Sequence, residues 1–195
     1  MPTTTIVRTT AVLILSLFVL PLLDAGPLSA QRGFQLPPLL MTTPAFADGA
    51  VIPDRYTCAA GQAVPNPAFS WTGAPDNTVG YAIIFHDLDV ALGGNTGDIL
   101  HWVLWNIPAA DGGIPEGMPA GTLPNGTVQG RGIGGGNVYF GPCAPAGERH
   151  HHYVFELYAL GEMLDLPETS GRDELLEAMA GKVTAKAAYV GRFHQ

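Results

Sequence analysis

Three stretches of the chain are almost continuously apolar and rich in β-branched and aromatic residues, and they constrain the fold more than any other feature. They cover residues 79–86 (VGYAIIFH), 101–107 (HWVLWNI) and 153–160 (YVFELYAL). Apolar runs of this length and composition are typical of β-strands, and the lack of regular polar alternation indicates burial on both faces. We therefore expect them to be the central strands of a sheet that is covered on both sides.

The sequence between these strands predicts turns and short extended pieces. The chain of 195 residues has 25 Gly and 17 Pro, which disfavours a helical bundle. We expect strand–turn–strand structure around residues 46–49 and 52–53, an extended piece at 66–71, and a hairpin turn at Asn125-Gly126. About 45 Gly- and Pro-rich residues separate the second and third strands, and loops of that length usually build a site.

One helix is predicted near the C-terminus. Thr169 or Ser170 can cap it, and acidic residues at 173–174 suit its first turn. Its apolar stripe would be Leu175, Leu176 and Met179, and Gly181 would follow its end. Residues 182–193 are predicted to form a further strand, with a second short helix as the alternative. The predicted fold class is mainly β, a sandwich with a few peripheral short helices.

The first thirty residues are typical of a signal peptide. Arg8 precedes an apolar run at residues 11–23 (AVLILSLFVLPLL), which as a helix would span about 20 Å, short of the ~30 Å hydrocarbon core. We expect a signal peptide at 1–30, a linker at 31–38, a folded domain at 39–195, and export to the periplasm or the extracellular space. No stable membrane span is expected, and no cysteine follows the apolar run that could carry a lipid.

Charge and cysteine content narrow the classes of partner. The net charge is −8 with no cluster of Lys or Arg, so a nucleic-acid-binding surface is not expected, and any bound anion must be held by local donors. Cys58 and Cys143 are the two cysteines. In an exported chain they can form a disulfide, and two buried free thiols are the alternative.

Polar side chains gather at the ends of the predicted strands. His86, Asp87 and Asp89 end the first strand, His101 begins the second, and three histidines at 150–152 precede the third. Loops converge at strand ends, and binding sites are often built there. Aspartates are also common turn formers after a strand, which is the alternative for Asp87 and Asp89.

A pocket made from these groups would suit an anion. The loop at 141–145 (GPCAP) adds a rigid segment with an available amide at Gly141, and Tyr153 adds a hydroxyl. Two imidazoles, His101 and His151, together with such donors can hold a phosphate or a carboxylate. We expect only His151 of the three consecutive histidines to face this pocket.

The motifs at these positions resemble those of the phosphatidylethanolamine-binding protein family, and in particular its bacterial branch of Raf kinase inhibitor-like proteins. The resemblance covers roughly residues 39–193 in a consistent order. The matching strings are YTCAAG at 56–61, PAFSWTGAP at 67–75, HDLDVA at 86–91, HW at 101–102, NIP at 106–108, QGR at 129–131, GPCAP at 141–145, HHHYVFELYAL at 150–160 and LLEAMAGKV at 175–183.

The resemblance implies a two-sheet antiparallel β-sandwich with a small cavity at one end that binds anions, including phosphorylated headgroups. The chain departs from the family's pattern at Leu88, Val90 and Ala91, where Pro, Ala and Pro are usual, and at His152, where Arg is usual. The loss of both prolines frees φ in the loop that borders the cavity. Carried over position by position, the ligand-binding residues are Asp87, Asp89, His101, Gly141, Pro142, His151 and Tyr153.

The function predicted from the sequence is therefore an exported, non-enzymatic protein that binds a small anion or a phospholipid headgroup. The alternatives are an inhibitor that contacts a kinase or protease through the same surface, and a metal-dependent hydrolase. A metal site is disfavoured because the donors match no compact motif and His86 and Asp87 point to opposite faces of a strand. No cofactor is expected, no catalytic motif is recognisable, and a homodimer and a protein target stay open.

Overall fold

The computed structural model describes residues 1–3, 39–94, 96–147 and 149–195. The predicted signal peptide and linker therefore lie, except for residues 1–3, outside the described residues. Within the described ranges, no helix combines the length and the apolar character that crossing a bilayer requires.

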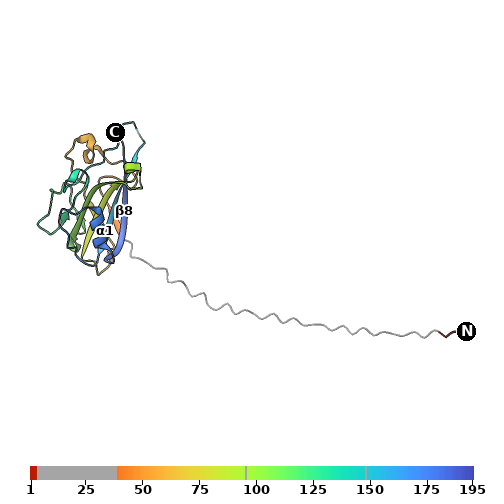
Figure 1. The fold of residues 1–195 in the computed structure, drawn as a ribbon. Helices are drawn as coiled ribbons and strands as arrows, with labels where there is room; N and C mark the ends of the chain where they lie inside the picture. The colour runs from red at the N-terminus through yellow and green to blue at the C-terminus, as the bar shows by residue number, and fades with distance from the viewer. Residues whose placement is uncertain (4–38, 95, 148) are drawn as a thin grey trace. The chain divides into compact units, whose positions relative to one another are not determined.

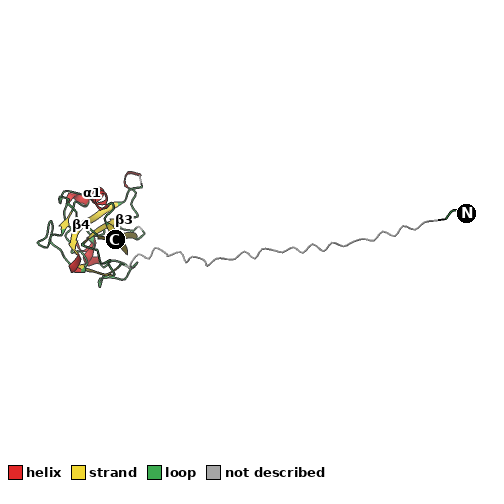
Figure 2. Ribbon diagram, turned by 90° about the horizontal axis from the view of Figure 1, so that it is seen from below, coloured by secondary structure: helices red, strands yellow, loops and turns green. Residues whose placement is uncertain are grey.

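The described chain folds into two antiparallel sheets, as predicted (Figures 1 and 2). The smaller sheet has the order β1-β2-β5 and consists of Leu40–Thr42, Phe69–Thr72 and Gly113–Ile114. The larger sheet has the order β6-β4-β3-β7-β8. Its strands are Val128–Gln129, Ile99–Pro108, Gly80–Asp87, His151–Leu160 and Val183–Phe193.

The three apolar runs become β3, β4 and β7, the central strands of the larger sheet. Every residue of β3 is buried, because β4 and β7 flank it and both of its faces are covered. The strand predicted for residues 182–193 is confirmed as β8, which pairs with β7 along its whole length.

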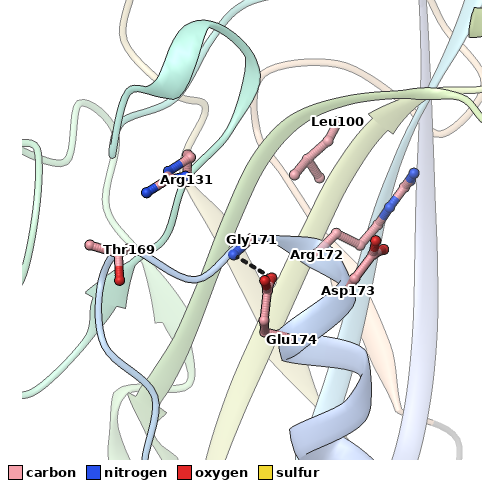
Figure 3. Close-up of a pocket in the computed structure, with 7 residues that line it drawn as sticks. All are labelled: Leu100, Arg131, Thr169, Gly171, Arg172, Asp173 and Glu174. Carbon is pink, nitrogen blue, oxygen red and sulfur yellow. Dashed lines mark hydrogen bonds between the residues drawn. The ribbon is translucent and has the colours of Figure 1, made fainter.

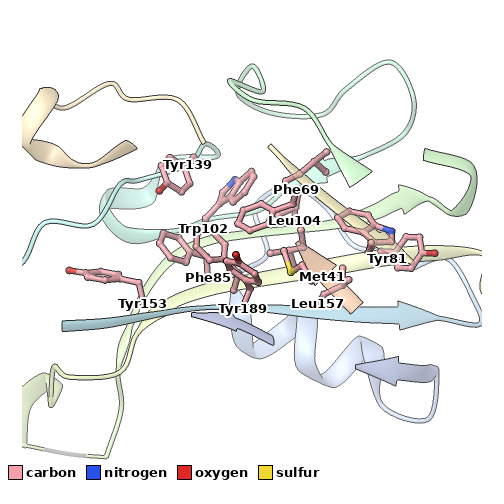
Figure 4. Packing of buried hydrophobic residues seen from close by; sticks show 14 of the residues in the cluster. Met41, Phe69, Tyr81, Phe85, Trp102, Leu104, Tyr139, Tyr153, Leu157 and Tyr189 are labelled. Carbon is pink, nitrogen blue, oxygen red and sulfur yellow. The ribbon is translucent and has the colours of Figure 1, made fainter. Parts of the chain in front are cut away.

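Two apolar layers stabilise the fold, one between the two sheets and one between the larger sheet and the helix. The layer between the sheets is dominated by aromatic side chains, among them Phe69, Phe85 and Phe155, whose rings pack within 4.6 Å of one another in successive pairs. Figure 4 shows this layer on one side of the larger sheet and the helix on the other side. The second layer lies beneath that helix, where Leu175 and Met179 pack on the outer face of β3 and β4.

The helix α1 spans Arg172–Met179 and differs from the prediction at its start. Gly171 is the N-cap residue, rather than Thr169 or Ser170, and its backbone N–H donates to Oε2 of Glu174 at 3.0 Å. Leu176, expected in the apolar stripe, is 44% exposed. The other short helices are single 3₁₀ turns at Asp54–Tyr56, Cys58–Ala60, Leu92–Gly94, Ala109–Asp111 and Ile133–Gly135 (η1 to η5).

The prediction of strands at 46–49 and 52–53 is wrong. This segment turns at Asp48-Gly49 and runs along the edge of β8, joined by hydrogen bonds such as Ile52 N–H to the carbonyl of Arg192 at 2.8 Å. Phe46 and Ile52 close over Gly191, where a Cβ atom would lie 2.4 Å from the Ile52 side chain. The turn at 123–127 forms around Asn125-Gly126, but it does not join two paired strands.

Candidate functional site

A cavity of about 260 Å³ opens where the C-terminal end of β3 meets the N-terminal ends of β4 and β7. Because the three strands are antiparallel neighbours, their polar terminal residues come together although they are far apart in the sequence. Four of the predicted site residues line the cavity: Asp87, His101, His151 and Tyr153. The remaining wall consists of Val90, Ile99, Ile133, Phe140, Cys143, Ala144 and Pro145.

Asp87 and His151 form a buried pair at the floor of this cavity. Nδ1 of His151 lies 2.8 Å from Oδ2 of Asp87, and the two residues are 5% and 2% exposed. The other oxygen of Asp87, Oδ1, accepts the backbone N–H of Asp89 at 2.9 Å. Both oxygens of the carboxylate are thus engaged by protein donors, which is what a buried charge requires.

His101 is fixed by the loop that precedes the Gly-Pro segment. Its Nδ1 lies 3.0 Å from the carbonyl oxygen of Phe140, and since a carbonyl only accepts, Nδ1 carries the proton. Burial lowers the pKa of His101 below its ordinary value of 6.5, although the carbonyls of Phe140 and Gly141 and the charge of Asp87 oppose this effect. The ring is therefore neutral at pH 7, with the lone pair on Nε2.

Tyr153 stands between the two imidazoles. Its ring meets His101 edge-on at 5.2 Å and lies nearly parallel to His151 at 6.4 Å. Its hydroxyl oxygen accepts the backbone N–H of Cys143 at 3.3 Å. Burial, together with Asp87, raises the pKa of the phenol well above its ordinary value of 10.0, so Tyr153 keeps its proton and can donate it in a hydrogen bond.

Cys58 and Cys143 form a disulfide, which confirms that alternative of the prediction. The bond ties the loop beside the cavity to η2, and the carbonyl of Pro142 also accepts the backbone N–H of Cys58 at 3.0 Å. Gly141 packs so closely on this segment that a Cβ atom would lie 2.5 Å from the carbonyl oxygen of Tyr56. Gly141 and Pro142 thus hold the cavity loop in place rather than line the cavity.

Asp89 also lies outside the cavity lining. It pairs with Arg149 at 2.5 Å, and its Oδ2 accepts the backbone N–H of His152 at 2.6 Å. These bonds hold the start of β7 against the loop after β3. As expected, only His151 of the three consecutive histidines lines the cavity: His152 contacts Asp89, and His150 packs on the ring of His194.

His86 points to the other face of the sheet, as the alternation along a strand predicts. Its Nδ1 lies 2.5 Å from Oδ2 of Asp98, whose other oxygen accepts from Arg172. Its Nε2 lies 3.7 Å from Glu156. His86 and Asp87, the last two residues of β3, therefore belong to different hydrogen-bond networks. Among the described residues, no group of three or more His, Cys, Asp or Glu is arranged to hold a metal ion.

A separate hollow of about 330 Å³ lies at the start of α1 (Figure 3). Arg131 and Arg172 border it, but Arg172 already donates to Asp98 and the N–H of Gly171 already donates to Glu174. Two carboxylates, Asp173 and Glu174, also face this hollow. An anion would meet these negative charges here, so this hollow is a poorer anion site than the cavity.

The fold and the cavity define a β-sandwich protein in which a small, mostly apolar pocket has polar groups at its floor. A model of the phosphatidylethanolamine-binding protein family matches residues 42–194, and the chain belongs to this family. The description of the matched family names binding, which agrees with the predicted class of binding protein.

Relatives and solved structures support this assignment. A UPF0098 protein from Methanothermobacter thermautotrophicus is 40% identical over 156 residues, which cover 80% of this chain and 98% of that protein. A Mycobacterium tuberculosis protein named as a candidate lipoprotein, LppC, is 35% identical over 159 residues, 80% of this chain and 72% of its own. The structure of the phosphatidylethanolamine-binding protein homologue CT736 from Chlamydia trachomatis has a TM-score of 0.70 and 30% identity, with 80% and 97% of the two chains covered.

The apolar side of the cavity was not predicted from the sequence. Ile99 lies two residues before the predicted strand at 101–107, and Phe140 directly precedes the Gly-Pro segment, so both lie close to recognised motifs. Ile133 was more difficult to recognise as a cavity residue, because it lies in the glycine-rich stretch 130–136 (GRGIGGG). A single large apolar residue among glycines was the available signal.

Proposed function

We propose that this protein is an exported binding protein whose cavity holds a small anion, namely a phosphate, a carboxylate or a phosphorylated headgroup. The observation that carries the proposal is the convergence of His101, His151 and Tyr153 on one cavity of about 260 Å³. Each of them comes from a strand end, so the rigid sheet fixes their relative positions. Pre-organised donors lose little entropy when a ligand binds.

The donors come from the protonated imidazole and the phenol. Because Nδ1 of His101 already donates to Phe140, a second proton on this ring must sit on Nε2, which turns an acceptor into a charged donor. Tyr153 keeps its proton because its pKa is raised by burial and by Asp87. The anion would thus be held by local hydrogen bonds, in a protein whose net charge is −8.

Asp87 does not prevent this binding. Its negative charge is compensated at the two oxygens by the ring of His151 and by the backbone N–H of Asp89. The role that we assign to Asp87 is to hold the His151 ring and to fix the tautomer at Nδ1. Asp87 could also accept from an amine carried by a phosphorylated headgroup.

Export is supported by three features. Residues 1–30 have the pattern of a signal peptide, and the two cysteines are joined in a disulfide, a bond that persists mainly in oxidising compartments. A relative, LppC, carries a name that describes a lipoprotein. This chain has no cysteine near its apolar run, so we propose a free exported protein rather than a lipid-anchored one.

Calorimetric titration of the purified protein with inorganic phosphate and with phosphoethanolamine tests the proposal. We expect saturable binding that His101→Gln weakens by at least about tenfold, the loss that one charged hydrogen bond represents. His150→Gln is the matched control, because His150 lies outside the cavity on the ring of His194. Equal effects of the two changes, or no binding to the unchanged protein, would refute the anion site.

A further inference from the structure

A second, apolar hollow adjoins the cavity. It measures about 350 Å³ and is lined by Asp98, Ile99, Leu100, Gly132 and Ile133. Ile99 and Ile133 also line the cavity that holds the polar groups. The two hollows therefore meet across these two isoleucines. We call the second hollow the isoleucine cleft.

The charge at the edge of the isoleucine cleft is neutralised. One oxygen of Asp98 lies 2.5 Å from Nδ1 of His86, and the other accepts from Arg172. Burial by itself would raise the pKa of Asp98, but these two partners outweigh burial and hold the pKa below 3.8. Asp98 is therefore a paired group, and the remaining side chains present hydrocarbon to whatever enters the cleft.

The loop that carries Ile133 is held against the sheet. At Gly132 a Cβ atom would lie 2.8 Å from the carbonyl oxygen of His101, so only glycine permits this close approach. Gly134 and Gly135 follow with φ angles of 71° and 77°, which close the turn η5. The backbone of a residue at the cavity, His101, thus sets the position of the loop, and the loop presents Ile133 to both hollows.

Ile133 is 38% exposed, although large apolar side chains are usually buried. The wall of the cavity is itself mostly apolar, and the isoleucine cleft extends this apolar surface away from the polar floor. A bare phosphate would contact the floor and leave this surface in water. Ligand pockets commonly pair a few fixed polar groups with a larger apolar lining that covers the rest of the ligand.

On this basis, and resting on the proposed anion site, we infer that the ligand is an anion with an attached apolar group, whose charged end lies at His101 and Tyr153 and whose apolar group lies in the isoleucine cleft. A monoalkyl phosphate has this chemistry. The same chemistry occurs in free esters and in lipids within a bilayer. The net charge of −8 disfavours approach to an anionic bilayer, so we assign the free ester.

The test is a series of inorganic phosphate, methyl phosphate and butyl phosphate, titrated by calorimetry into the full chain at one pH. Burial of one methylene tightens binding by up to about fourfold. We expect methyl phosphate to bind about as tightly as phosphate, and butyl phosphate at least about tenfold more tightly. Ile133→Ser should bring the ratio of the affinities for butyl phosphate and phosphate close to one, because it replaces the apolar side chain that both hollows share.

Val138→Ser is the matched control, because Val138 is 39% exposed, follows the same glycine-rich loop and lines neither hollow. This variant should keep the full gain for butyl phosphate. Equal affinities along the series would overturn the inference and leave the anion site standing. No binding by any of the three would remove the anion site and the inference with it. The inference would also be overturned if the protein sedimented with phosphatidic acid vesicles but bound butyl phosphate no more tightly than phosphate.

Discussion

Nδ1 of His151 lies 2.8 Å from Oδ2 of Asp87, although the two residues are 64 positions apart in the sequence. The antiparallel pairing of β3 with β7 causes this proximity, since Asp87 is in register with Tyr153 and His151 begins the same strand. The polar floor of the cavity is thus a direct consequence of strand register. A shift of one residue would turn these side chains to the other face of the sheet.

Replacing Asp87 by Asn should destabilise the protein by about 1–3 kcal/mol, the usual cost of an unsatisfied buried polar group. The carboxylate accepts from two donors, Asp89 N–H and His151 Nδ1, with separate oxygens. Asparagine has one oxygen, so one of these donors would face an NH₂ group. Urea unfolding at pH 7 measures the loss. Asp76→Asn, at an exposed turn, is the control, and equal unfolding free energies for the two variants would show that the pair is not formed.

The affinity for phosphate should increase as the pH falls through the pKa of the His101 ring in the complex. Burial lowers the pKa of His101 from 6.5, so the ligand-free ring is neutral at pH 7. A bound anion favours the protonated ring and raises its pKa, and binding therefore takes up a proton. The affinity should rise with falling pH until the free ring is itself protonated, and then level off.

Calorimetric titrations with phosphate between about pH 5 and pH 8 measure this dependence. The titration of phosphate itself is removed by repeating the series with a sulfate or sulfonate ligand. His101→Gln should give a flatter profile at weaker affinity, because glutamine cannot gain a charge. A profile of the same slope in this variant would exclude His101 as the titrating donor.

Reduction of the disulfide should lower the free energy of unfolding by about 2–4 kcal/mol. The Cys58–Cys143 bond closes a long stretch of chain, 85 residues in separation, and holds the loop whose Cys143 N–H donates to Tyr153. Thermal unfolding of the full chain with and without a reductant measures this effect. A double Cys58→Ser, Cys143→Ser variant should behave like the reduced protein and should not respond to the reductant. An unchanged melting temperature after complete reduction would contradict the prediction.

Much of the fold could be predicted from the sequence because the central strands are continuous apolar runs that are easily recognised. Residues buried on both faces of β3, β4 and β7 must be apolar throughout, and such runs have few alternative structures. The edge segments could not be predicted in this way. Residues 46–53 carry buried side chains, yet their backbone bonds go to β8, more than 130 residues away, and no local pattern reports such a partner.

The candidate site was also predicted only in part from the sequence. The sequence motifs placed four site residues at strand ends, namely Asp87, His101, His151 and Tyr153. Strand pairing brings these residues together around the cavity. The separation of Asp89 from the cavity was not visible, because its partners Arg149 and His152 are identified only by the geometry of the loop. The isoleucine cleft could not be predicted either, since it requires Ile133 of the turn η5 to lie beside Ile99 at the start of β4.

The anion site is tested most directly by following the six histidine rings by ¹⁵N NMR while phosphate is added. Two rings, those of His101 and His151, line the cavity, whereas His86, His150, His152 and His194 lie elsewhere. We predict saturable shifts of the ring nitrogens of His101 and His151 with one common dissociation constant, and no saturable response from the other four. Shifts confined to His150 and His194, or an unchanged His101 at saturating phosphate, would contradict the anion site.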